Sequence, residues 1–166
     1  MPRRDHHLES ACGYLELGMA AEAEEELRQV EPERAGDLDV LSVWQSLWCV
    51  TRRWPEAAEV ARRLCDMEPN NGDWPIQLAY ATRRASSIEE AERILRDARE
   101  RFPRESTIVY NLACYACQQD RLDEARTLLR TAFEMNASHY RLAQTDPDLA
   151  PLRAELDILL SGGGLA

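Results

Sequence analysis

Residues 109–132 read VYNLACYACQQDRLDEARTLLRTA and show the pattern of helices most clearly. Small or apolar residues recur in both halves at the spacing of one helix face: Val109, Leu112, Ala113, then Ala125, Leu129 and Ala132. A short polar turn separates the two halves. The pattern therefore predicts two amphipathic helices that pack against each other as a hairpin.

A Glu-Ala pair marks the same point of a repeated unit along the chain. Its alanines lie at positions 23, 57, 91 and 125, which are 34 residues apart each time. The residues twelve positions earlier are mostly small, which lets two helices approach closely: Ala11, Gln45, Ala79 and Ala113. Because a lone helical hairpin leaves apolar faces exposed, we expect the four hairpins to stack.

The period and the helix–turn–helix pattern resemble the tetratricopeptide repeat (TPR) family, bacterial type, over about Arg4 to His139. The resemblance implies an all-α, right-handed TPR superhelix, a solenoid of antiparallel helix pairs. We expect one TPR domain over 1–166, with repeats at about 4–37, 38–71, 72–105 and 106–139. A helical cap at 140–160 and a disordered tail at 161–166 would follow.

Two segments depart from the regular pattern. Pro32 precedes the position where the second helix of the first repeat should end, so we expect that helix to end early. The period breaks after repeat four, where we expect a short helix near 138–144 and a longer one near 148–160. Four leucines give the longer helix an apolar stripe that would close the solenoid: Leu149, Leu152, Leu156 and Leu159.

Composition narrows the class of function. The net charge is −10, which disfavours sequence-independent binding to nucleic acid and docking on an anionic membrane. No apolar run has the length of a membrane span, and the N-terminus does not resemble a secretory signal. Five cysteines without such a signal favour free thiols in the cytoplasm. Residues 4–37 carry 10 acids and 3 arginines, so one end of the chain holds most of the negative charge.

Motifs for catalysis, cofactors or metals are nearly absent. The sequence has no phosphate-binding loop, no Gly-x-Ser-x-Gly and no His-Glu-x-x-His, so we expect no enzyme and no cofactor. His6 and His7 are adjacent, and neighbouring helix positions point about 100° apart, so we expect no shared metal site. Cys114 and Cys117 share a helix face, but late in the helix, where a thiolate is disfavoured. We interpret them as small apolar residues.

In the TPR family, the first helices of successive repeats line a concave groove that binds peptides. The resemblance maps the following residues of this chain to such a protein-binding groove: Leu8, Cys12, Ser42, Ser46, Cys49, Ile76, Tyr80, Arg83, Arg84, Tyr110, Asn111, Cys114 and Cys117. The cysteines would make the lining small and apolar, the tyrosines are typical of binding hot spots, and Arg83 and Arg84 could pair with a carboxylate.

The sequence thus predicts a non-catalytic interaction module or scaffold that binds a peptide or protein segment in the groove. Two alternatives stay open: a self-assembling structural protein, and a small acidic chaperone of the secretion type. The carboxylate clamp of TPR co-chaperones is not matched, because its lysine is missing and Val43 stands at an asparagine position.

Overall fold

The computed structural model describes residues 5–161. Over this range the chain forms α-helices and two 3-10 helices and no strand, and none of these helices is both long and apolar enough to cross a membrane. The chain divides into two compact units, residues 1–87 and 88–166, whose boundary falls after the first helix of the third predicted repeat.

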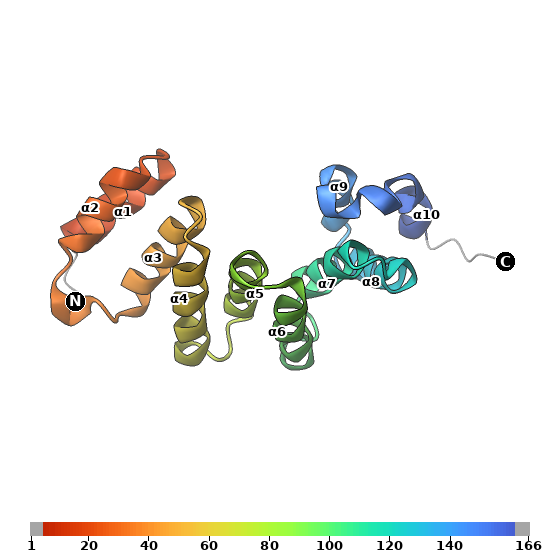
Figure 1. Cartoon of the computed structure of the whole chain (residues 1–166), viewed down its shortest axis with the longest axis horizontal. Coiled ribbons are helices and arrows are strands. Elements are labelled where there is room, and N and C mark those ends of the chain that lie inside the picture. The colour runs from red at the N-terminus through yellow and green to blue at the C-terminus, as the bar shows by residue number, and fades with distance from the viewer. Residues whose placement is uncertain (1–4, 162–166) are drawn as a thin grey trace. The chain divides into compact units, whose positions relative to one another are not determined.

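Unit one (5–87 of the described residues) contains two helical hairpins, a connecting 3-10 helix and one further helix. Their bounds are α1 His6–Glu16, α2 Ala20–Arg28, η1 Pro32–Arg34, α3 Leu38–Val50, α4 Trp54–Met67 and α5 Asp73–Ala85. Helices α1 and α2 lie side by side, and so do α3 and α4 (Figure 1). The early end of α2, before Pro32, confirms the expectation from the sequence.

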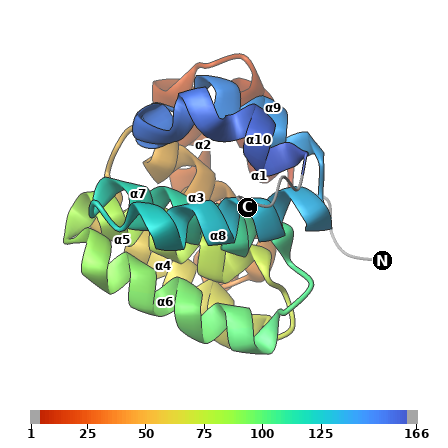
Figure 2. The same cartoon turned by 90° about the vertical axis from the view of Figure 1, so that its right-hand side faces the viewer.

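Unit two (88–161 of the described residues) contains one helix, a complete hairpin and the C-terminal elements. Their bounds are α6 Ile88–Arg101, α7 Ser106–Gln118, α8 Leu122–Met135, α9 Ser138–Thr145, η2 Pro147–Glu155 and α10 Leu156–Leu160. We call residues 138–160 the C-terminal segment. It packs on α7 and α8, and α9 and α10 lie over these helices in Figure 2.

The 34-residue period is visible in the packing of the second helices. Their four marker alanines are fully buried, with no exposed surface: Ala23, Ala57, Ala91 and Ala125. The leucines one turn further along α2, α6 and α8 are also buried. In unit one, Ala11 and Ala23 join Leu27 and Leu47 in one apolar core. Small residues therefore stand where helices approach, and larger ones fill the space beside them.

The turns between paired helices repeat a left-handed residue. Gly18, Arg52 and Asp120 have φ of 74°, 59° and 58°, at positions that differ by multiples of the period. In each turn the next amide donates to a carbonyl five residues back, as in Met19 N to Tyr14 O at 2.8 Å. This is a Schellman ending, which favours glycine at the left-handed residue. Only the first of the three turns has glycine, so Arg52 and Asp120 are conformationally strained.

The C-terminal segment corrects one detail of the sequence prediction. The expected α-helix near 148–160 is instead a 3-10 helix over Pro147–Glu155, followed by the short α10. Pro151 lies inside η2 and cannot donate a backbone hydrogen bond, which opposes a regular α-helix there. The predicted leucine stripe is nevertheless buried: Leu149, Leu152, Leu156 and Leu159.

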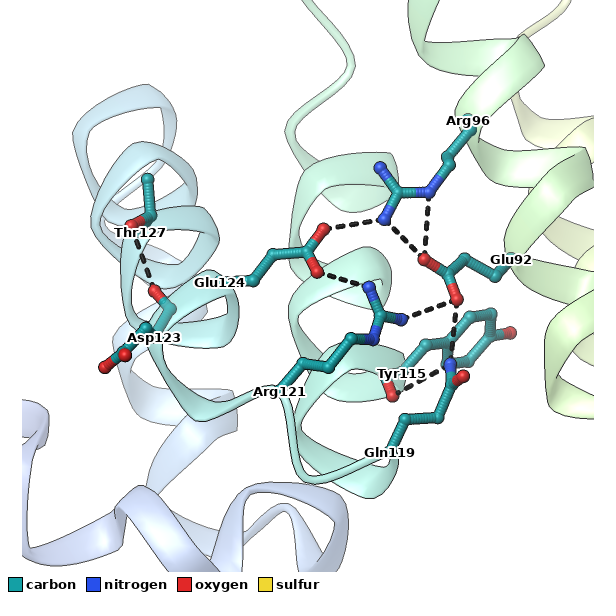
Figure 3. Close-up of polar contacts among 8 residues, drawn as sticks. All are labelled: Glu92, Arg96, Tyr115, Gln119, Arg121, Asp123, Glu124 and Thr127. Atoms are coloured by element: carbon teal, nitrogen blue, oxygen red, sulfur yellow. Dashed lines mark hydrogen bonds and ion pairs between the residues drawn. The ribbon is translucent and has the colours of Figure 1, made fainter.

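A buried carboxylate joins α6 to the α7–α8 hairpin (Figure 3). Glu92 is 8 % exposed and accepts hydrogen bonds from Arg96 at 2.8 Å, Gln119 at 2.8 Å and Arg121 at 2.6 Å. Glu124 bridges the same two arginines from α8. Burial opposes ionisation of Glu92, but the three donors outweigh it and hold the pKa of this carboxyl below its usual range. The third and fourth repeats are therefore connected by a charged network within unit two.

Candidate protein-binding surface

Unit one presents most of its predicted groove residues to solvent. Cys12, Ser46, Tyr80 and Arg84 are exposed. The rest are partly exposed: Leu8, Ser42, Cys49, Ile76 and Arg83. Of these, Leu8 also packs against the core formed by α1 and α2. The first helices of unit one therefore leave small polar and aromatic side chains accessible.

A pocket of about 390 Å³ lies between α3 and α5. The sequence predicted three of its residues: Ser42, Ser46 and Cys49. The others complete its wall: Gln45, Asn71, Asp73, Trp74 and Gln77. The groove prediction from the sequence missed most of these other residues. It used the middle of each first helix, whereas several of these residues lie in the turn before α5 and at the start of that helix.

Hydrogen bonds fix the wall of this pocket. The Trp74 indole N–H donates to Glu68 at 2.7 Å, and the Asn71 amide donates to the same carboxylate at 3.1 Å. Gln45 is 3 % exposed and its amide nitrogen contacts the Cys49 sulfur at 3.4 Å. Ser42 donates to a carbonyl of its own helix. Most residues that line the pocket have polar side chains, which could make hydrogen bonds to a peptide.

An exposed cation on α5, the helix that forms one wall of this pocket, lies over aromatic rings. The Arg84 guanidinium carbon is 3.6 Å from the centre of the Tyr80 ring and 5.2 Å from that of Trp54. The two rings meet edge to face at 5.8 Å. Burial raises the pKa of the Cys49 thiol, and the positive charge of Arg84 partly opposes this shift. Stacking holds the planar guanidinium in one orientation, suited to a carboxylate.

In unit two the C-terminal segment covers the predicted groove face of α7. Tyr110, Cys114 and Cys117 are only 5 %, 3 % and 4 % exposed, whereas Asn111 is partly exposed. The Tyr110 hydroxyl donates to Asp146 at 2.8 Å, and its ring stacks on His139 at 4.9 Å. Burial first, and then neighbouring groups including Asp146, raise the pKa of Tyr110 strongly. These α7 residues thus contact the chain's own segment.

The cysteine pair lies within this covered face. The Cys114 sulfur contacts the Asp146 carboxylate at 3.6 Å. Burial, followed by the charge of Asp148, raises the pKa of Cys117, which favours the unreactive thiol over the thiolate. Asp146 uses its second oxygen to accept from the Asp148 amide at 2.9 Å. The cluster of Cys114, Asp146 and Asp148 therefore anchors the C-terminal segment through hydrogen bonds.

The ligand atoms of the two N-terminal histidines lie closer together than their helix positions suggest. His6 and His7 are adjacent on α1, yet one potential ligand atom from each lies within 4.8 Å of the other and of a Glu26 oxygen. The separation of about 100° between neighbouring positions applies to the Cα–Cβ directions, and the long imidazole side chains can turn back toward each other.

Comparison with known proteins shows the fold. No protein-family model matches the sequence, and no curated protein matches it. Among solved structures, PilF from Pseudomonas aeruginosa superposes with a TM-score of 0.71 at 19 % identity, covering 97 % of this chain and 76 % of that one. MamA from Desulfovibrio magneticus RS-1 gives 0.70 at 13 % identity and covers 96 % of both chains. Both are TPR proteins.

The chain has the TPR fold. A further MamA crystal structure agrees, with a TM-score of 0.70, 13 % identity and coverage of 91 % of this chain and 90 % of that one. The TPR likeness inferred from the spacing of the alanines, and the all-α solenoid class, are thereby confirmed. At these identities the comparison concerns the fold, and a TPR fold is typical of protein-interaction scaffolds.

Proposed function

We propose that this chain is a non-catalytic interaction module that binds an extended segment of a partner protein over α3 and α5. The observation that carries the proposal is the pocket between these helices. One of its walls belongs to α5, the helix that also carries Tyr80 and the Arg84 guanidinium that lies over aromatic rings. Tyrosine, tryptophan and arginine are the residue types that dominate binding energy at protein interfaces. The TPR fold supports the same class of function.

The lining of the pocket suggests the chemistry of the partner. Amide side chains of Asn71 and Gln77 could hydrogen-bond to the backbone of an extended peptide. The Arg84 guanidinium, which lies over the Tyr80 ring, could donate hydrogen bonds to a carboxylate of that peptide. The partner segment would therefore be extended and carry one acidic residue. The covered face of α7 would not contribute unless the C-terminal segment moved away.

Site-specific photo-cross-linking tests this proposal. A photoreactive amino acid at Ser46, in the pocket, should yield a cross-linked partner in a lysate of the source cell. The same amino acid at Arg62 provides the matched control, because Arg62 is exposed on α4 and does not line the pocket. Equal products at the two positions would contradict the proposal. A product with the mass of two chains would instead support the self-assembling alternative.

Charge reversal provides an independent measurement once a partner is captured. Arg84→Glu should weaken binding at least about tenfold, since it replaces attraction for a carboxylate by repulsion. Arg62→Glu makes the same change of net charge on α4 and should leave the affinity nearly unchanged. If both variants weaken binding equally, only the overall charge of the chain matters and the pocket is not the binding site.

A further inference from the structure

The first turn of α1 is anchored at several points. The Asp5 carboxylate accepts hydrogen bonds from the His7 and Leu8 amides at 3.0 and 3.3 Å. Its other oxygen accepts from Arg34 at 3.1 Å, which connects the start of α1 to η1. Leu8 then packs on the core of the first hairpin. The two histidines of this turn are thus exposed side chains on a fixed backbone.

The neighbouring helix brings a carboxylate to the same place. Glu26 lies near the end of α2, directly before the buried Leu27, so its position is fixed by the core. Its Oε2 is 2.7 Å from His7 Nδ1. The His6 ring meets the His7 ring edge to face, with centroids 5.9 Å apart. Two imidazoles and one carboxylate therefore converge from two helices.

We propose that His6, His7 and Glu26 bind a divalent transition-metal ion of the zinc class. One potential ligand atom from each residue already lies within 4.8 Å of the other two. Metal–ligand bonds of about 2.0–2.2 Å in a tetrahedral site place ligands about 3.5 Å apart, so small side-chain rotations close the set. Two nitrogens and one oxygen suit Zn²⁺, Ni²⁺ or Cu²⁺, and water completes the coordination at this exposed position.

The charge around the site favours a cation. Glu22, Glu24 and Glu25 precede Glu26 on α2, and residues 4–37 carry 10 acids against 3 arginines. Arg28 is occupied by Glu24 and Glu25, and Arg34 by Asp5 and its neighbours Asp37 and Asp39. A bound ion would connect the start of α1 to the end of α2. This site is separate from the proposed peptide pocket and does not depend on it.

Cobalt(II) titration of the full chain tests the proposal, because Co²⁺ replaces Zn²⁺ and is coloured. We expect saturation at one ion per chain, with visible d–d bands and without the intense near-ultraviolet band of a thiolate ligand. That spectrum distinguishes the site from the chain's free cysteines. A thiolate band, or the absence of saturable binding, would overturn the proposal.

Single substitutions then assign the ligands. His6→Ala, His7→Ala and Glu26→Gln should each weaken binding at least about tenfold. Glu25→Gln is the matched control: it removes the same charge from the adjacent position of α2, where the side chain pairs with Arg28, and should change affinity less than about threefold. Circular dichroism verifies that each variant is helical. Equal losses for Glu25→Gln and Glu26→Gln would show that only general charge attracts the ion.

Discussion

Glu92→Gln should lower the free energy of unfolding by about 2 kcal/mol at neutral pH. The substitution keeps the size of the side chain and removes its charge. The loss comes from the hydrogen bonds that Glu92 accepts from three side chains, those of Arg96, Gln119 and Arg121. Because this carboxylate joins α6 to the α7–α8 hairpin, its loss should weaken unit two.

The magnitude follows from burial. Hydrogen bonds to a charged group contribute about 1.5–3 kcal/mol each in well-buried sites. Here the side chains of Arg96 and Arg121 are 47 % and 34 % exposed, so water can solvate them once the carboxylate is gone. Glutamine also keeps one acceptor oxygen. The sum of the full contributions of these hydrogen bonds is therefore too large, and about 2 kcal/mol is the expected net loss.

The same substitution has a defined dependence on pH. The pKa of Glu92 is lower in the folded chain than its ordinary value of about 4.3. The stabilisation from its ionised form is therefore complete above that ordinary value and is lost as pH falls through the folded pKa. The gap between the wild type and Glu92→Gln should shrink over this acidic range, because a protonated glutamic acid resembles glutamine.

Urea unfolding followed by circular dichroism, at neutral pH and at several acidic values, measures the gap. Asp97→Asn is the control, since Asp97 is an exposed acid on the same helix and its loss should change stability by less than about 0.5 kcal/mol. A gap that is absent at neutral pH, or that stays constant into acid, would refute the assignment of the stabilisation to the ionised carboxylate.

Three further predictions address the turns and the C-terminal segment. Arg52→Gly and Asp120→Gly should each raise the free energy of unfolding by about 0.5–1 kcal/mol, because glycine adopts a positive φ without strain. Thermal unfolding measures the change. Arg52→Ala, which keeps the strained backbone, should show no gain in stability. Leu152→Ala should lower the free energy of unfolding in urea by about 3 kcal/mol, because Leu152 is fully buried. Ile158→Ala changes a side chain that is 53 % exposed and should lower it by less than about 1 kcal/mol. Similar losses for the two variants would contradict the observed packing. Burial lowers the pKa of His139, so the neutral form of this side chain stabilises the C-terminal segment at pH values above the ordinary pKa of about 6.5. That stabilisation is lost as the pH falls below about 6.5. Hydrogen-exchange protection of residues 138–160 should therefore drop on acidification, and unchanged protection would contradict this.

Much of the fold could be predicted because the repeat fixes which face of each helix is buried. The alanine period placed Ala23, Ala57, Ala91 and Ala125, and all four are fully buried. The left-handed turns at Arg52 and Asp120 could not be predicted, because arginine does not favour that conformation and aspartate adopts it less readily than glycine. There, the packing of the two flanking helices imposes the turn.

The candidate site was harder to predict, because a period assigns faces within a repeat but not the segment that covers them. Tyr110 and Cys114 lie on the predicted face of α7, and only the structure shows Asp146 bonded to both. The 3-10 conformation around Pro151 could not be predicted either, because the leucine stripe indicates which residues are buried and not the type of helix. The proximity of the His6 and His7 rings depends on side-chain reach, which the helix positions alone do not give.

The aromatic residues give the two units different optical properties. All four tryptophans, at 44, 48, 54 and 74, belong to unit one, where Trp44 and Trp48 pack with ring centroids 5.0 Å apart. Indole emission therefore reports on residues 1–87, while far-ultraviolet dichroism reports on helices of both units. Coincident melting curves by the two signals would mean that the units unfold in one cooperative step. Separated curves would show that half of a repeat array can lose its structure while the other half keeps it.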